Sequence, residues 1–225
     1  MNRPYIICHM MTSVDGRIDC EMVGKLEGVQ EYYSTLHELK IPTTLSGRVT
    51  AMLELALPGK FEPKDTTPLG CEAYSKVRDA EGYEVITDTN GTLLWKDDID
   101  ETKPHLIITS EKVSKDYIDY LNKQHISWIA CGKDKIDLVR AMEILASQFG
   151  VQRMGVVGGP IINTAFLKVG LLDEISILIG LGIDGRKNMP PVFDGLPMDQ
   201  SVFPLKLKHV QAYDNGAVWL RYDVI

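Results

Sequence analysis

The chain of 225 residues lacks the features that mark several classes of protein. It has no run rich in lysine and arginine, and its net charge is −7, so we expect no nucleic-acid partner. It has no apolar run long enough to cross a bilayer, and its first residues lack the layout of a signal peptide. We therefore expect a cytoplasmic protein that acts on a small molecule and does not contact a membrane.

Cysteine and histidine are scarce, and neither shows the spacing of a metal site. The four cysteines form no C-x-x-C pair, and the five histidines form no H-x-H or H-E-x-x-H motif, so we expect no bound metal. Cys8 and Cys131 lie in apolar, strand-like stretches and are predicted to be buried thiols. No Walker loop with its lysine, Ser-His-Asp order or glycosidase-like carboxylate pair stands out, so hydrolysis and phosphoryl transfer are not expected.

The chain does contain a regular alternation of strand-like and helix-like segments. Strands are predicted at 5–11, 43–46, 105–109, 126–130, 155–157 and 174–181, and helices at 30–39, 49–57, 114–123, 137–149 and after Pro160. Strands that lead into helices with almost no loop predict a mostly parallel sheet covered on both faces. We therefore expect a single α/β domain over 1–225.

Two antiparallel hairpins are also predicted, at 83–95 around Asn90-Gly91 and at 205–223 around Asn215-Gly216. The segment 60–80, which follows the predicted helix over 49–57, is polar and interrupted by proline, which is typical of a loop. Among the helices, the one over 30–39 is predicted to face the core with Tyr33 and Leu36. The helix after Pro160 is predicted to do so with Phe166, Leu167 and Val169.

Gly158-Gly159-Pro160 joins a strand to a helix by a tight turn. The first N–H groups of such a helix and its dipole favour an anion, and glycine lets a ligand approach the backbone. Pro160 suits the first helical position because that position needs no N–H. The turn is either a phosphate cradle or a purely structural joint.

Other polar residues also follow predicted strands. Gly47 and Arg48 form a second strand-to-helix turn, in which Arg48 suits a phosphate, and Thr50 and Glu54 share one helix face. Arg48 and Glu54 are alternatively solvated surface residues, and Thr50 is alternatively a local cap.

Thr109 and Ser110 lie at the end of a predicted strand. Their hydroxyls would either contact a ribose or a 2′-phosphate, or cap the next element. Ser13-Val14-Asp15-Gly16 is a turn that either borders a ligand or is only a turn.

Three of these segments together resemble the reductase domain of riboflavin biosynthesis, within the dihydrofolate-reductase-like superfamily. Ser13 to Arg17 is similar to the family's S-x-D-G element, and Gly47 to Thr50 to its G-x-x-T turn. The run Gly158-Gly159-Pro160-Ile161-Ile162-Asn163, preceded by Asp137-Leu138 and followed by Gly170-Leu171-Leu172-Asp173-Glu174, matches the third and longest motif. The ordered set covers nearly the whole chain.

The resemblance implies a homodimeric three-layer α/β protein that binds NADPH and transfers hydride to a small heterocyclic or sugar-phosphate substrate. It implies that the cofactor is held by residues of the two glycine turns and of one strand end, namely Gly47, Arg48, Val49, Thr50, Thr109, Ser110, Gly158, Gly159, Pro160 and Ile161. It places Ser13, Asp15 and Val157 beside the substrate, and Glu54 where the family has an aspartate.

The chain departs from the family pattern on the substrate side. His9 stands where the family has a lysine, Val157 where it has a glutamate, and the D-D-P-x-L-T-x-R stretch is missing. His9 and Glu54 are the candidate groups for proton transfer. His9 is alternatively a core histidine with its hydrogen bonds satisfied. The sequence thus leaves open a reductase of riboflavin biosynthesis, a reductase of another pteridine-like or carbonyl substrate, and a non-catalytic NADP-binding protein.

Overall fold

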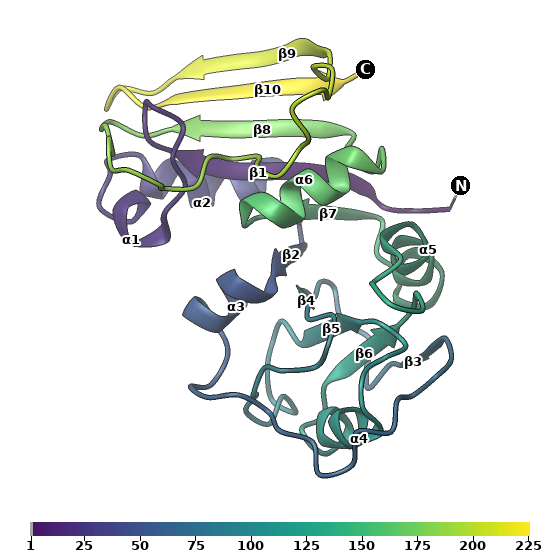
Figure 1. Cartoon of the computed structure of the whole chain (residues 1–225). Coiled ribbons are helices and arrows are strands. Elements are labelled where there is room, and N and C mark those ends of the chain that lie inside the picture. Colours follow the sequence, from purple (N-terminus) through teal and green to yellow (C-terminus); the bar gives the residue numbers. More distant parts are fainter. Residues whose placement is uncertain (1) are drawn as a thin grey trace. The chain divides into compact units, whose positions relative to one another are not determined.

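The computed structural model describes residues 2–225, so Met1 lies outside the described residues, as does the side chain of Cys20. The chain forms two compact units (Figure 1). Unit 1 consists of Met1–Pro4 and Pro42–Met154, and unit 2 of Tyr5–Ile41 and Gly155–Ile225. Strand β7 (Arg153–Val156) carries the chain from one unit into the other. A single domain over 1–225 stays a prediction.

Unit 1 is built on a sheet with strand order β3-β6-β5-β4-β2. Its strands are β2 (Thr43–Gly47), β3 (Ala73–Ser75), β4 (Glu84–Thr87), β5 (His105–Thr109) and β6 (Ser127–Ala130). All are parallel to their neighbours except β3, which pairs antiparallel with β6. The carboxyl ends of β2, β4 and β5 therefore lie at one edge of this sheet, where open α/β sheets bind ligands.

The helices of unit 1 are α3 (Arg48–Glu54), α4 (Lys115–Lys123) and α5 (Leu138–Phe149). Ser114 and Asp137 cap α4 and α5 by accepting backbone N–H bonds, and α5 ends at Gly150 with a left-handed φ of 72°. Trp95, Tyr117 and Trp128 belong to the core cluster of this unit. The caps thus fix where α4 and α5 begin, and the core cluster fixes the faces through which the elements of this unit pack.

Unit 2 combines a parallel pair of strands with the C-terminal hairpin. β1 (Tyr5–Thr12) is parallel to β8 (Glu174–Ile179), which pairs antiparallel with β10 (Val218–Val224), and β10 pairs antiparallel with β9 (Leu205–Ala212). The helices are α1 (Cys20–Val23), α2 (Val29–Glu38) and α6 (Pro160–Lys168). Figure 1 shows α6 in front of these strands and α2 behind them.

The α/β fold with a mostly parallel sheet and a C-terminal antiparallel hairpin is confirmed. Cys8 and Cys131 are buried, as predicted. Within residues 2–225, no helix combines the length and apolar character that a membrane crossing needs. In the same range, no group of three or more histidine, cysteine or acidic residues is arranged to hold a metal ion.

The predicted hairpin at 83–95 is wrong. β4 pairs in parallel with β2 and β5, and the chain after Gly91 forms only an isolated bridge between Leu94 and Leu57. The reason is Asp88, whose carboxylate accepts hydrogen bonds from the backbone N–H groups of Thr92 and Leu93 at 2.5 and 2.9 Å. This side chain takes the donors that an antiparallel partner would otherwise use.

Three smaller expectations also fail. The short strand β3 lies in the predicted loop 60–80, where it completes the edge of the sheet beside β6. Tyr33 is 58% exposed, because α2 packs on the core through Val29, Tyr32 and the correctly predicted Leu36. Val169 is 47% exposed, because α6 ends at Lys168 and the chain turns outward after it.

Candidate functional site

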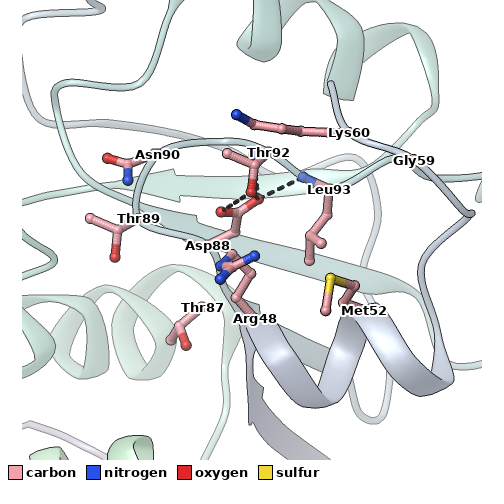
Figure 2. Close-up of a pocket in the computed structure, with 10 residues that line it drawn as sticks. All are labelled: Arg48, Met52, Gly59, Lys60, Thr87, Asp88, Thr89, Asn90, Thr92 and Leu93. Atoms are coloured by element: carbon pink, nitrogen blue, oxygen red, sulfur yellow. Dashed lines mark hydrogen bonds between the residues drawn. The ribbon is translucent and has the colours of Figure 1, made fainter. Parts of the chain in front are cut away.

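A cavity of about 420 Å³ lies in unit 1 at the carboxyl ends of β2 and β4 (Figure 2). Its size is within the range of small-molecule sites. It is lined by residues from α3, from the segment after it and from the loop after β4: Arg48, Met52, Gly59, Lys60, Thr87, Asp88, Thr89, Asn90, Thr92 and Leu93. The cavity is thus built from strand ends and short connections, as ligand sites of open sheets are.

Two cations, Arg48 and Lys60, line the cavity together with one buried carboxylate, Asp88. Arg48 and Lys60 are exposed, and within residues 2–225 neither forms an ion pair or a hydrogen bond through its side chain. The carboxylate of Asp88 is fully buried and is used inside the protein, where it also accepts a bond from the Thr92 hydroxyl at 3.1 Å. Figure 2 shows Asp88 turned toward Thr92 and Leu93. The unbalanced charge is therefore positive, which favours an anionic ligand.

The wall behind the cavity is a hydrogen-bonded layer. Thr109 and Ser110 are fully buried, and their hydroxyls donate to the carbonyl of Thr89 at 3.0 and 2.9 Å. Tyr117 donates to the carbonyl of Leu93 at 3.1 Å, and burial together with the nearby Asp88 raises the pKa of its hydroxyl well above the usual value. Thr109 and Ser110 thus hold the loop that lines the cavity and do not line it themselves.

Helix α3 presents only one of its faces to the cavity. Arg48 and Met52 line it because residues four apart share a helix face, and Gly47 is the half-buried N-cap before them. Val49, Thr50 and Glu54 project from other faces and do not line it, since successive residues are turned by about 100°. Val49 and Glu54 are exposed to solvent, and Thr50 is half-buried.

The Gly158-Gly159-Pro160 turn in unit 2 has the predicted strand-turn-helix form. Gly158 has a φ of 125°, which favours glycine, the Gly158–Gly159 peptide bond is cis, and Pro160 is the first residue of α6. Ile161 is 65% exposed, and Val157 before the turn is half-buried. The first N–H groups of α6 have no carbonyl within the helix to bond, so they are available to an anion.

His9 has the surroundings of a core histidine, the alternative that the sequence left open. Its ring is fully buried, stacks on Tyr32 at 4.7 Å and contacts the hydroxyls of Ser176 at 2.9 Å and Thr35 at 3.1 Å. Burial lowers the pKa of this ring from 6.5 to about 4. A neutral ring with both nitrogens in contact with protein atoms does not reach a substrate in this conformation.

Ser13 and Asp15 also have partners within unit 2. The Ser13 hydroxyl donates to Asp15 at 2.8 Å and accepts from the backbone of Arg17 at 3.1 Å. The two carboxylate oxygens of Asp15 accept from the backbone N–H groups of Asp184 and Gly185 at 2.9 and 3.1 Å. The turn predicted beside the substrate therefore contacts the segment that follows β8.

Sequence reasoning missed Lys60 and the loop Thr87–Leu93 of the cavity. Asn90-Gly91 in this loop predicts a hairpin turn, whereas the strand before the loop, β4, pairs in parallel with β5. A parallel β4 puts this loop at the same edge as the Gly47 turn, so the error in strand direction concealed the cavity.

The sequence matches the model of one protein family, the RibD C-terminal domain, over residues 4–219. Two curated relatives are named 2,5-diamino-6-ribosylamino-4(3H)-pyrimidinone 5′-phosphate reductase. The one from Methanothermobacter thermautotrophicus is 24% identical over 225 residues, which cover 95% of this chain and 94% of the relative. The one from Aquifex aeolicus is 23% identical over 204 residues, which cover 87% of this chain and 84% of the relative.

The fold also matches solved structures. A pyrimidine reductase-like protein from Corynebacterium diphtheriae aligns with a TM-score of 0.71 and 19% sequence identity, covering 100% of this chain and 93% of that chain. At this identity the likeness concerns the fold.

Proposed function

Because the chain belongs to the RibD C-terminal domain family, we propose that it is an NADPH-dependent reductase of a ribosylamino-pyrimidine phosphate in riboflavin biosynthesis. Two curated relatives that align with most of their length carry the name of that reductase, which supports the proposal. The observation that carries it is the cavity of unit 1, where Arg48 and Lys60 have no ion-pair partner among residues 2–225 and outnumber the one buried carboxylate, Asp88.

The residues of this cavity fit one phosphate-bearing half of a dinucleotide. Arg48 offers a planar fork of N–H donors that suits a phosphate, and Lys60 adds a mobile positive charge. The loop Thr87–Leu93, held by Asp88 and Thr89, gives the site a fixed wall. The free N–H groups at the start of α6 are the second candidate for binding an anionic group of the cofactor. When bound, the cofactor would supply the hydride.

The proton required by the reduction needs a donor, and Glu54 is our candidate. It is exposed on the face of α3 that it shares with Thr50, which does not line the cavity, so the role requires the substrate to bind along that face of α3. We do not assign this role to His9, because its ring is buried and in contact with Ser176 and Thr35. Glu54→Gln should then lower kcat while leaving the NADPH affinity unchanged. Unchanged turnover in that variant would remove Glu54 from the mechanism.

The decisive experiment is a titration of the purified protein with NADPH and NADH, followed by nicotinamide fluorescence. We expect saturable binding with a preference for NADPH, and oxidation of the cofactor when the pyrimidine ribosylamine phosphate is added. Binding followed by oxidation only with a pteridine-like or carbonyl compound would overturn the substrate assignment. Binding with no turnover on any of these compounds would favour a non-catalytic NADP-binding protein. Failure to bind either cofactor would overturn the proposal.

Homodimerisation and a cytoplasmic location, which the family resemblance implies, belong to the same proposal. Sedimentation equilibrium of the purified chain tests the first. A single species with the mass of one chain at micromolar concentration would contradict the dimer.

A further inference from the structure

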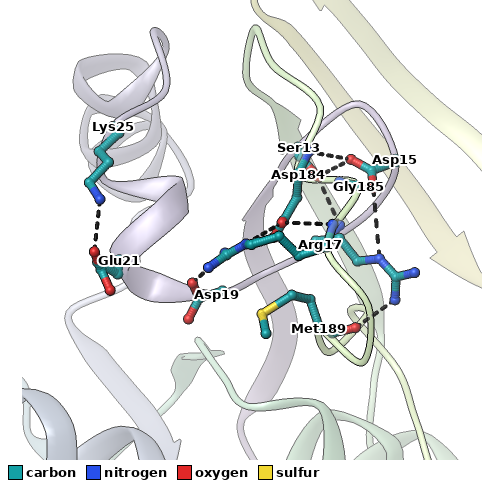
Figure 3. Close-up of polar contacts among 10 residues, drawn as sticks. Ser13, Asp15, Arg17, Asp19, Glu21, Lys25, Asp184, Gly185 and Met189 are labelled. Carbon is teal, nitrogen blue, oxygen red and sulfur yellow. Dashed lines mark hydrogen bonds and ion pairs between the residues drawn. The ribbon is translucent and has the colours of Figure 1, made fainter.

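A long segment without regular structure connects β8 to β9 in unit 2. Connections of this length are uncommon unless they have a function. Its first part, residues 181–195, is attached to the rest of unit 2 at several points, and we call it the strap. Figure 3 shows one end of the strap against the turn that contains Ser13, Asp15 and Arg17.

The near end of the strap is held by Asp15. The carboxylate accepts from the backbone of Asp184 at 2.9 Å and of Gly185 at 3.1 Å, and the Val14 N–H donates to the carbonyl of Gly182 at 2.8 Å. Hydrogen bonds from Ser13 and from these two backbone groups hold the pKa of Asp15 at about 2. The carboxylate is therefore ionised at neutral pH, and each of its oxygens is bound to the strap.

The middle of the strap is held by Arg17 and its neighbour. The guanidinium of Arg17 donates to the carbonyl of Met189 at 2.5 Å, and the Ile18 N–H donates to the carbonyl of Pro190 at 3.1 Å. Both contacts reach backbone atoms, so they fix the path of the strap whatever its side chains are.

The far end of the strap is attached to α6. The side-chain amide of Asn163 donates to the carbonyl of Val192 at 2.8 Å, and the Asp194 N–H donates to the hydroxyl of Thr164 at 2.9 Å. Both helical residues are buried, and they lie in the turn of α6 that follows Pro160. The strap therefore connects the Ser13–Arg17 turn directly to the helix whose first N–H groups are the candidate anion site.

We propose that Asp15 and Arg17 are positioning residues. They hold the strap against α6 and thereby keep the first N–H groups of that helix in the position that binds the cofactor. This inference rests on the proposed function for the identity of the ligand. The attachment of the strap to the turn and to α6 rests on the contacts described above. It replaces the expectation that Asp15 binds the substrate, because both of its oxygens already accept bonds from the strap.

The proposal predicts an effect opposite in sign to simple electrostatics. Neutralising a carboxylate in an anion-binding protein should improve the binding of an anionic ligand through the loss of repulsion. If Asp15 acts through the strap, Asp15→Asn should instead weaken NADPH binding. A side chain that only stabilised the fold would not reverse the sign of this effect.

The strap provides its own reporter, because Arg186 and Lys187 are exposed and are cleavage sites for trypsin. Cleavage requires a segment to leave its docked position, so its rate reports the opening of the strap. In the ligand-free protein we expect Asp15→Asn to raise the rate of cleavage at these two residues by about fivefold or more. The matched control is Asp65→Asn, since Asp65 lies in unit 1 and, among residues 2–225, its carboxylate accepts bonds only from nearby Thr67.

A second variant tests the far end. Thr164→Val keeps the shape of the side chain but removes the acceptor for Asp194, so it should also speed cleavage, by a smaller factor. An unchanged cleavage rate in Asp15→Asn would overturn the attachment of the strap by Asp15. These cleavage rates are measured without cofactor, so they test the attachment of the strap even if the protein binds no NADPH.

The coupling to α6 is tested with NADPH itself. Saturating NADPH should slow the cleavage of the native strap, and by linkage Asp15→Asn should lower the NADPH affinity, whereas Asp65→Asn should change neither. Faster cleavage of Asp15→Asn with unchanged or tighter NADPH binding would overturn the coupling. Absence of NADPH binding to the native protein would overturn the proposed function and the coupling with it.

Discussion

The cavity of unit 1 and the polar turn of unit 2 use similar residue types in opposite ways. In the cavity, the side chains of Arg48 and Lys60 have no ion-pair or hydrogen-bond partner among residues 2–225, while buried groups behind them hold the wall. In unit 2, Asp15 and Arg17 hydrogen-bond to backbone groups of the strap, and Ser13 donates its hydroxyl to Asp15. The buried Nε of Arg17 has no hydrogen-bond partner among residues 2–225 and lies 3.8 Å from the Asp15 carboxylate. Arg48 in the cavity and the Ser13–Arg17 turn in unit 2 both belong to segments that resemble a family motif.

The difference shows how to distinguish charged residues that bind a ligand from charged residues that hold the fold. A charged side chain that has satisfied its hydrogen bonds within the protein would have to give them up before it could bind a ligand. A charge that stands unpaired at a cavity has no such cost. The predictions below therefore remove paired groups, where stability should suffer, and unpaired groups, where affinity should suffer.

The largest effect is expected at Asp88, the paired group that shapes the cavity. Asp88→Ala leaves the N–H groups of Thr92 and Leu93 without their acceptor, and should lower the free energy of unfolding by about 2–4 kcal/mol. Urea unfolding measures this loss. Asp88→Asn, which keeps one acceptor oxygen, should lose about half as much, and equal losses in the two variants would contradict the role of these bonds.

A pH-dependent effect is expected at His9. Burial lowers the pKa of the folded ring to about 4, whereas an unfolded histidine titrates near 6.5, so the unfolded chain binds the proton more readily. The stability that depends on a neutral His9 is complete above about pH 6.5 and is lost as the pH falls toward 4. Between about pH 7 and about pH 5 this loss amounts to about 2 kcal/mol.

The measurement for His9 is the difference between native protein and His9→Gln in urea unfolding at the two pH values. His9→Gln should be less stable at neutral pH and should lack this part of the pH dependence. Glu174 and Arg221 also influence the ring, and both are unchanged in the variant, so their titration cancels. If the two proteins showed the same pH dependence, the buried neutral ring would be excluded. His125→Gln, at an exposed site, serves as control.

The unpaired group Arg48 should affect affinity and leave stability almost unchanged. Arg48→Ala should weaken NADPH binding by about tenfold or more, and NADH binding by less, because the guanidinium prefers a phosphate partner. Calorimetric titration with both cofactors measures the two ratios. Arg140→Ala is the control, since Arg140 is paired with Glu72 and Glu143 in the same unit. Equal losses for NADPH and NADH would remove the phosphate role of Arg48.

The order and type of most elements could be predicted from the sequence, because local signals and packing agree there. His105–Thr109 was predicted at its observed bounds, since a buried parallel strand is a continuous run of apolar residues. Asn215-Gly216 predicted the C-terminal hairpin correctly, whereas Asn90-Gly91 did not mark one. The difference is Asp88, whose side-chain bonds to the backbone of Thr92 and Leu93 close a turn without a second strand.

The candidate site could be predicted only in part. Strand-end glycines and Arg48 were visible as motifs, but Lys60 lies in a stretch without any pattern and reaches the cavity through the fold. Whether a polar residue is paired depends on contacts distant in sequence. The carboxylate of Asp15 accepts hydrogen bonds from residues 184 and 185, and the ring of His9 contacts the hydroxyl of Ser176. These partners are distant in sequence, so the sequence alone leaves both roles open.

The smallest effects should come from the hydroxyls behind the cavity. Thr109 and Ser110 both donate to the carbonyl of Thr89, so either bond alone still holds the loop. Ser110→Ala or Thr109→Val should each weaken NADPH binding by about two- to threefold, as expected for the loss of one neutral hydrogen bond that holds the wall of the cavity. The double variant should lose more than the product of the two, because the carbonyl then keeps only the N–H of Ser110. Titration of NADPH against the four proteins of this cycle measures the coupling. A single-variant loss as large as that of Arg48→Ala would mean instead that the hydroxyl contacts the cofactor directly.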